Sequence, residues 1–198
     1  KWCGAGGWRL GAMLIPEEFK NDFKPVFLGL ASETYSCAPS PVQWAALKAY
    51  ESMSVVEQYL KLQQRILSRL GRFSAERLRE AGVRCYDPVG GFYIMPDFEN
   101  VREQLAQEGI TNAQELCQKI LEDTGVAILP GIAFGFPDDY LVARLAFVDF
   151  DGQSIINQIE EKGEQIIDQD DFVQTYAPKV YEGILKLKEW ANVKVLIK

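Results

Sequence analysis

Histidine does not occur anywhere among the 198 residues. Its absence excludes the Ser-His and Cys-His pairs that activate many enzymatic nucleophiles, and it removes the imidazole ligands that are common in metal sites. Any general acid or base in this protein must therefore be a lysine, a carboxylate or a tyrosine.

Cysteine is scarce, and its four copies lie far apart, at positions 3, 37, 85 and 117. No pair has the Cys-x-x-Cys spacing of zinc sites, and the wide spacing does not suggest a disulfide framework. We therefore expect four reduced thiols in a cytoplasmic protein that holds no metal.

Long apolar runs and concentrated positive charge are also missing. Apolar runs such as residues 126–136 are short and interrupted by proline and glycine, so we expect no membrane-spanning segment. The 21 basic and 28 acidic side chains give a net charge of −7, and no lysine and arginine cluster could follow a phosphate backbone. These features argue against nucleic acid and membrane partners, while 47% hydrophobic residues suffice for a core.

The most informative stretch is residues 1–11, Lys-Trp-Cys-Gly-Ala-Gly-Gly-Trp-Arg-Leu-Gly. Lys1 precedes small residues that would not crowd a ligand, and Arg9 lies in an apolar stretch, residues 8–15, that predicts a buried strand ending at Pro16. A lysine on a glycine-rich loop can reach a carbonyl carbon, and an arginine in a half-buried strand suits an anion such as phosphate. The alternative is a glycine-rich hairpin with a surface lysine and a structural arginine. The pattern favours a cofactor site.

In this register the stretch resembles the signature of the class I/II pyridoxal-phosphate aminotransferases of fold type I. That signature has a lysine, a small residue, an apolar residue or alanine, a glycine, an arginine, an aliphatic residue and a final glycine or alanine at fixed spacing. Every constrained position from the lysine onwards fits. The matching residues are Lys1, Gly4, Ala5, Gly7, Arg9, Leu10 and Gly11.

The resemblance implies roles for both ends of the stretch. Lys1 would be the catalytic residue that binds pyridoxal 5'-phosphate covalently and then carries a proton at the substrate Cα, and Arg9 would bind the cofactor phosphate. In this family the glycine-rich phosphate turn, the aromatic residue that stacks on the ring and the aspartate at the pyridine nitrogen precede the lysine. We therefore expect this chain to be the C-terminal half of such an enzyme, inactive without its N-terminal half.

A second arginine, Arg144, lies in the apolar run of residues 141–147, which predicts a strand. Because an unpartnered guanidinium is costly to bury, we expect an anion beside it. In the resembling family an arginine in this Arg-Leu-Ala-Phe context pairs with the substrate's α-carboxylate, so the resemblance assigns substrate binding to Arg144. The alternative is a structural salt bridge to a carboxylate such as Asp138 or Asp139.

Three further segments resemble the family, and two of them have a simpler alternative. Residues 88–93, Pro-Val-Gly-Gly-Phe-Tyr, match an element that brings backbone near the substrate, which implies a substrate-binding role for Gly91, although glycines there also permit a tight start to a strand. Residues 129–135 match a Leu-Pro-Gly-x-x-Phe-Gly element. Residues 32–40, rich in hydroxyls, lie near the dimer interface in the family, or else form a turn whose hydroxyls cap the next helix.

The expected fold class is α/β. Residues 1–53 would be the end of the large cofactor domain, and residues 54–198 the interdomain helix and small C-terminal α/β domain of a fold type I PLP-dependent transferase. Residues 16–25 are expected to be a surface connection, and the arginines of the long helix (Arg65, Arg69, Arg72, Arg77 and Arg79) a solvated face. Helices are predicted near 42–50, 54–82, 111–125, 153–167 and 176–190, and strands near 83–86, 91–95, 126–131 and 141–147. Thr111 or Asn112 is expected to cap the start of the helix near 111–125, and Gly125 to end it.

The resemblance implies an aminotransferase that acts on an amino acid and a 2-oxo acid, as a homodimer. Two alternatives stay open: a PLP-dependent β-lyase or other α-carbon enzyme of the same fold, and a PLP-sensing domain of a transcription regulator. The acidic composition favours an enzyme. Aspartate-specific members of one subgroup carry an arginine for the distal carboxylate in the stretch that corresponds to residues 26–43, where this chain has none.

Overall fold

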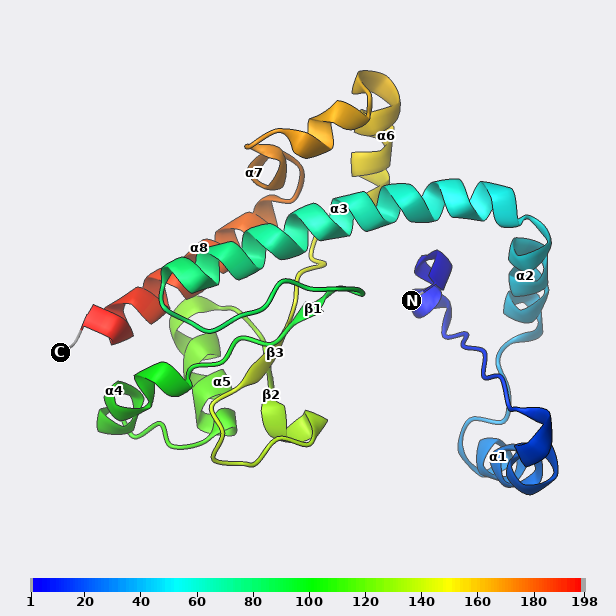
Figure 1. Ribbon diagram of the computed structural model, residues 1–198, viewed down its shortest axis with the longest axis horizontal. Helices are drawn as coiled ribbons and strands as arrows, with labels where there is room; N and C mark the ends of the chain where they lie inside the picture. The colour runs from blue at the N-terminus through cyan, green and yellow to red at the C-terminus, as the bar shows by residue number, and fades with distance from the viewer. Residues whose placement is uncertain (1, 197–198) are drawn as a thin grey trace. The chain divides into compact units, whose positions relative to one another are not determined.

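The computed structural model describes the backbone of residues 2–196 and the side chains of residues 2–193. Its internal contacts divide it into two units, Lys1–Gln63 and Gln64–Lys198, and the boundary falls inside the long helix α3 (Met53–Glu80). Figure 1 shows the elements of each unit. Among the described residues, no helix is both long enough and apolar enough to cross a membrane.

The first unit contains short helices joined by irregular chain. Its elements are η1 (Trp2–Trp8), η2 (Glu17–Phe19), α1 (Lys20–Thr34), α2 (Ser40–Glu51) and the beginning of α3. No side chain of residues 2–63 is buried, and several large apolar ones are largely exposed, Leu14 at 95% and Trp44 at 71%. A unit with this much uncovered apolar surface has the surface of a binding face rather than of an independent domain.

Two expectations for this unit are wrong. The strand predicted at residues 8–15 does not form, because Arg9 has the left-handed φ of 57° and no neighbouring strand is described in this unit to pair with it. The surface connection predicted at residues 16–25 is instead η2 and the first turns of α1. Acidic residues in those first turns favour a helix start, and the rings of Phe19, Phe23 and Phe27 contact one another at four-residue spacing.

The second unit is built on a small antiparallel sheet of order β1-β3-β2. Its strands are β1 (Tyr93–Ile94), β2 (Leu129–Pro130) and β3 (Ala143–Ala146), with Tyr93 opposite Ala146 and Leu129 opposite Arg144. The helices of the unit, besides the rest of α3, are η3 (Glu99–Val101), α4 (Arg102–Gln107), α5 (Ala113–Thr124), η4 (Gly131–Phe134), α6 (Gly152–Lys162), η5 (Glu164–Asp168), α7 (Phe172–Tyr176) and α8 (Pro178–Leu196).

Helix α5 packs against both β2 and α8. Its ends confirm the sequence prediction: the Asn112 side chain accepts hydrogen bonds from the backbone N–H of Gln114 and Glu115, and Gly125 ends the helix in the left-handed region with φ 74°. Apolar residues on its inner face, among them Leu116 and Ile120, are fully buried. Local capping and a buried stripe together therefore place this helix.

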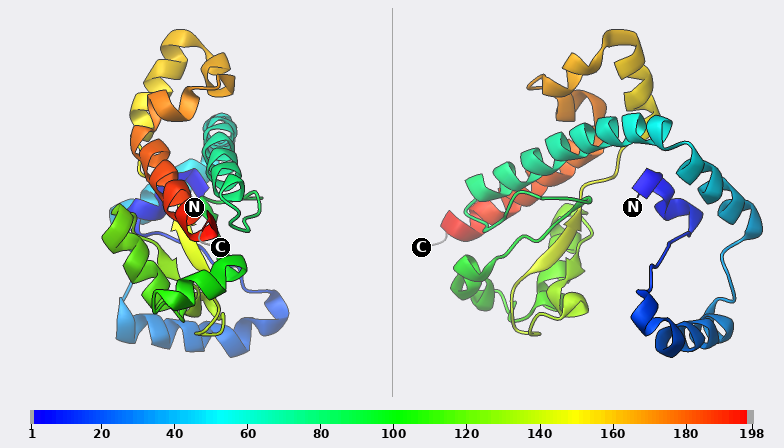
Figure 2. Two further views of the ribbon diagram at one scale, coloured as in Figure 1. Left: turned by 90° about the vertical axis from the view of Figure 1, so that its left-hand side faces the viewer. Right: turned by 45° about the vertical axis from the view of Figure 1, so that its right-hand side comes forward.

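Helices α3 and α8 run side by side in the same direction (Figures 1 and 2). The ring of Phe73 stacks on that of Tyr181 at 5.5 Å, and seven residues further along each helix Lys188 donates to Glu80 at 2.7 Å. At Gly71 the surroundings come closest to α3, because a Cβ built there would lie 2.5 Å from Pro88 Cγ and 2.9 Å from Phe147 Cζ. Only a residue without a side chain permits this approach.

The sequence expectation that the arginines of α3 form a solvated face is only partly right: Arg72 and Arg79 are exposed, whereas Arg65, Arg69 and Arg77 are half-buried. Arg65 forms ion pairs with Glu164 and Asp168, and Arg69 donates to the carbonyl of Gln169 at 3.0 Å. These contacts bind η5 to α3 across about a hundred residues of chain. Arg77 and Arg79 likewise pair with Glu80 and Asp87, whereas Arg72 is exposed.

A polar network connects η3 to the loop before β3. Glu99 accepts from the backbone N–H of Leu141 at 2.6 Å and pairs with Arg102, and the Tyr140 hydroxyl donates to Asp97 at 2.9 Å. The hydrogen bond from Arg102 lowers the pKa of Glu99, and the bond to Asp97 raises the pKa of Tyr140. The loop before β3 is therefore held by hydrogen bonds to the carboxylates of Glu99 and Asp97.

All four cysteines are free thiols. Burial raises the pKa of Cys85 and of Cys117 to about 11, so both remain protonated at neutral pH and are poor nucleophiles.

We expect Gly71→Ala to destabilise the protein by about 1–2 kcal/mol, because overpacking against Pro88 and Phe147 outweighs the better helix propensity of alanine. Gly29→Ala is the matched control, since a Cβ there meets nothing within 4 Å inside helix α1. Chemical denaturation of both variants checks the difference. Equal stability of Gly71→Ala and the wild type would contradict the close approach.

We also expect the contribution of Glu99 to the stability of the protein to depend on pH. Because the pKa of Glu99 is lowered from its ordinary 4.5, its contribution to stability is complete above that value and is lost as the pH falls through the lower folded-state pKa. Glu99→Gln should therefore cost about 1 kcal/mol at pH 7 and less at pH 3. Urea unfolding at both pH values measures this, with Glu103→Gln, exposed on α4, as the control. A cost independent of pH would refute the assignment.

Candidate functional site

Arg144 lies at the centre of the candidate site. It sits in β3 between the buried side chains of Ala143 and Leu145 and is itself half-buried. Its guanidinium carbon Cζ lies over two aromatic rings, 4.2 Å from the centroid of Tyr93 and 4.2 Å from that of Phe134. Rings at this distance attract a cation through their π electrons.

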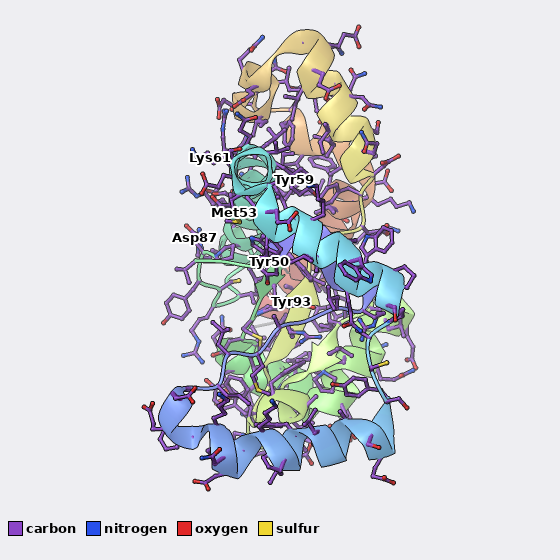
Figure 3. The ribbon with its side chains drawn as sticks, turned by 90° about the vertical axis from the view of Figure 1, so that its right-hand side faces the viewer. Tyr50, Met53, Tyr59, Lys61, Asp87 and Tyr93 are labelled. Atoms are coloured by element: carbon purple, nitrogen blue, oxygen red, sulfur yellow. The ribbon has the colours of Figure 1, made fainter. Side chains whose placement is uncertain are left out.

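The pairing of the strands brings these three side chains together. Tyr93 is opposite Ala146, two residues after Arg144, so both side chains lie on one face of the sheet (Figure 3 labels Tyr93). Phe134 comes from η4, which follows β2 directly, where the backbone N–H of Gly131 donates to the carbonyl of Val142 at 2.8 Å. A Cβ at Gly131 would lie 2.8 Å from that same carbonyl oxygen, so the turn requires glycine.

Arg144 has no carboxylate partner within the described part of the chain. The salt bridge considered as an alternative does not form: the backbone carbonyls of Asp138 and Asp139 accept hydrogen bonds from Ala113 and Arg102, but neither carboxylate pairs with Arg144. The rings cannot neutralise its charge, and they leave its N–H groups available. The arrangement can therefore bind an external anion.

Gly91 lies two residues before Tyr93, outside the sheet. Its φ of 68° is in the left-handed region, and a Cβ there would meet nothing within 4 Å. The need for glycine at this position is thus conformational, as the tight-turn alternative expects. Substrate binding by Gly91 stays a prediction.

Lys1, the proposed cofactor lysine, lies outside the described residues. Arg9, its companion in the signature, is exposed, and its Nη1 donates to the carbonyl of Gly6 at 3.3 Å. No carboxylate among the described residues pairs with Arg9, and Cβ atoms at Gly6 and Gly7 would meet nothing within 4 Å. A guanidinium with free donors beside uncrowded backbone fits a phosphate group.

An apolar hollow of about 700 Å³ lies between η1 and α2, and its lining residues include the sequence neighbours of Arg9. Its lining includes Trp8 and Leu10, which flank that arginine, and Val42. The ring of Trp2 stacks on that of Tyr50 at 4.5 Å; Figure 3 labels Tyr50. The hollow is a surface that apolar groups could fill.

The hydroxyl-rich residues 32–40 do not cap the following helix, so that alternative is wrong. The N-cap position of α2 is Pro39, which forms no side-chain cap, and the Thr34 hydroxyl donates back to the carbonyl of Leu30 at 2.7 Å. Instead, Gln43 donates to the carbonyl of Ala38 at 2.6 Å and closes the turn. An approach to a partner subunit stays a prediction.

Sequence reasoning missed Tyr93 and Phe134 as parts of this site, although both lie in segments that resemble the family. The Phe-Tyr and Phe-Gly pairs mark the ends of β1 and η4, but only strand pairing shows that their rings reach Arg144.

Sequence comparisons identify the family of the chain. The family model for aminotransferase class I and II matches residues 1–146. The chain is 32% identical over 144 residues to the aspartate aminotransferase of Geobacillus stearothermophilus, a match that covers 72% of this chain and 34% of that protein. It is 30% identical over 140 residues to the aspartate/prephenate aminotransferase of Cereibacter sphaeroides, covering 69% of this chain and 33% of that protein.

Solved structures show the same fold. The aspartate aminotransferase of Thermus thermophilus with maleate has a TM-score of 0.61 at 17% identity, over 93% of this chain and 37% of that one. The aromatic aminotransferase of Pyrococcus horikoshii OT3 has a TM-score of 0.59 at 21% identity, over 96% of this chain and 40% of that one. The chain thus spans about a third of the length of the curated relatives it matches. With a family model that covers well over half of its residues, this chain belongs to the class I and II aminotransferases.

Proposed function

We propose that this chain is part of an aminotransferase that moves an amino group between an amino acid and a 2-oxo acid with pyridoxal 5'-phosphate held on Lys1. The observation that carries this proposal is Arg144, whose guanidinium lies over two rings and pairs with no carboxylate of the described residues. That is the chemistry a carboxylate ligand needs, because a guanidinium offers two parallel N–H donors to its two oxygens.

The residues of this chain would divide the work as follows. Arg144 binds the α-carboxylate of the amino acid and so fixes the direction of the Cα–H bond. The amine of Lys1 removes the proton from Cα. Arg9 holds the cofactor phosphate, and the backbone at Gly91 borders the substrate. Pyridoxal 5'-phosphate, when bound, supplies the electron sink for the charge that develops at Cα.

We further propose that an N-terminal half of the same chain completes the cofactor domain. In this division residues 1–53 belong to the large domain, and residues 54–198 form the interdomain helix and the small domain. The absence of buried side chains among residues 2–63 and the apolar hollow beside Trp8 support a covering segment. The protein would work in the cytoplasm as a homodimer, in keeping with its four free thiols.

The substrate would not be a dicarboxylate held by an arginine of residues 26–43, because that stretch contains no arginine. The named relatives act on aspartate or on aspartate and prephenate. Aspartate, aromatic amino acids and alanine therefore form the panel to test.

The decisive experiment uses the protein that contains both halves, loaded with pyridoxal 5'-phosphate. We expect one or more amino acids of the panel to change the visible absorbance of the cofactor and to yield the matching 2-oxo acid. Borohydride reduction followed by peptide mapping should place the cofactor mass on Lys1. Release of ammonia would instead indicate a β-lyase, and no spectral change with any amino acid would contradict catalysis and favour a sensor.

Arg144→Lys tests the carboxylate site. A lysine keeps the charge but loses the two-pronged hydrogen bond, so kcat/KM for the preferred amino acid should fall about 10- to 100-fold. Steady-state kinetics measures this, and Arg72→Lys, at an exposed position of α3, is the matched control. If both variants retain wild-type kcat/KM, Arg144 does not bind the substrate.

A further inference from the structure

Arg144 contacts two aromatic rings and pairs with no carboxylate of the described residues. Arg77 also lies over a ring, that of Phe73 at 5.6 Å, but it pairs with Glu80 as well. Arg65, Arg79 and Arg102 each pair with carboxylates, which occupy their N–H donors. Tyr93 and Phe134 contact the guanidinium of Arg144 through their π faces, at 4.2 Å each. Stacking of this kind attracts the cation and restricts its tilt, and it leaves the N–H groups at the edge of the guanidinium plane unused.

Both rings are themselves held by backbone, so they can restrict the arginine. Tyr93 is in β1, and its neighbour Phe92 accepts a hydrogen bond at its carbonyl from Phe147 N–H. The turn that carries Phe134 is fastened at Gly131 to the carbonyl of Val142 and is closed by the bond from Gly135 N–H to the carbonyl of Ile132, at 3.2 Å. The position of each ring is therefore set by the backbone hydrogen bonds of the segment that carries it.

A guanidinium with fixed orientation favours one shape of anion. A carboxylate is planar, so its two oxygens and its Cα all lie in the plane of the fork. A phosphonate can also offer two oxygens in that plane, but its tetrahedral phosphorus then places the third oxygen and the carbon out of it. A guanidinium free to tilt would accept either group. A guanidinium whose tilt is restricted therefore selects an anion by its shape as well as by its charge.

We propose that Tyr93 and Phe134 are positioning residues that fix the plane of the Arg144 guanidinium and so make the site select a planar carboxylate over a tetrahedral anion. This inference rests on the proposed function, because it assumes that Arg144 receives the substrate's carboxylate. It assigns to two residues outside the signature a part in substrate choice.

The test compares the preferred amino acid with its 1-aminophosphonate analogue in the complete, cofactor-loaded protein. Tyr93→Leu and Phe134→Leu should each raise KM for the amino acid about 10-fold, the size expected for loss of one partly desolvated cation–π contact. Inhibition by the phosphonate should weaken much less, so the ratio of its inhibition constant to KM falls. Change in kcat should be smaller than change in KM.

Matched variants separate orientation from packing. Phe136→Leu removes a ring that is 38% exposed, the same as Phe134, but that stacks on Tyr140 rather than on the arginine, so the ratio should stay at its wild-type value. Tyr93→Phe and Phe134→Tyr keep a ring face and should also retain it. If a leucine variant fails to fold, Phe134→Met replaces it, since methionine fills the space without a ring.

The outcomes distinguish this inference from the function on which it rests. If the leucine variants behave like Phe136→Leu while Arg144→Lys still lowers kcat/KM, the positioning role is overturned and the carboxylate site stands. If Arg144→Lys has no effect, the proposed site itself fails. A fall in the ratio only in variants without a ring face supports the proposal.

Discussion

The second unit depends on one constraint, the placement of the Arg144 charge in β3 between two buried residues. Ala143 and Leu145, its neighbours in β3, face the core, so the arginine has no alternative position in the sheet. The guanidinium is contacted by the ring faces of Tyr93 and Phe134 rather than by a carboxylate. This arrangement leaves the N–H donors of the guanidinium available, and it requires β1 and the β2–η4 turn to flank β3 on either side.

Close packing of α3 supports this arrangement from another direction. Gly71 lets the helix approach Pro88 and Phe147, and Phe147 directly follows the strand that carries Arg144. Ion pairs of Arg65 then fasten η5 to the same helix. Residues 147–198, beyond the part that the family model matches, are thereby joined to the rest of the second unit by both charge and packing.

The first unit contrasts with the second. Residues 2–63 contain no buried side chain, while Leu70, Leu116 and Phe147 of the second unit are fully enclosed. Apolar surface of this extent is stable only when something covers it. The proposed N-terminal half would provide this cover and, with it, the remaining groups around the cofactor.

The sequence alone determined those features that depend on neighbouring residues: the Asn112 cap, the Gly125 stop, the long helix α3 and the family signature from Lys1 to Gly11. Predictions from the sequence failed where the structure of a segment depends on a partner that is distant in sequence. The strand predicted around Arg9 needs a second strand beside it, and the arginines of α3 pair with residues about a hundred positions away. The meeting of Tyr93 and Phe134 at Arg144 likewise follows from strand register. Hydrogen bonds and charge interactions between residues a few positions apart can be predicted from the local sequence. Contacts across the sheet form only after tertiary packing has fixed which backbone segments lie side by side.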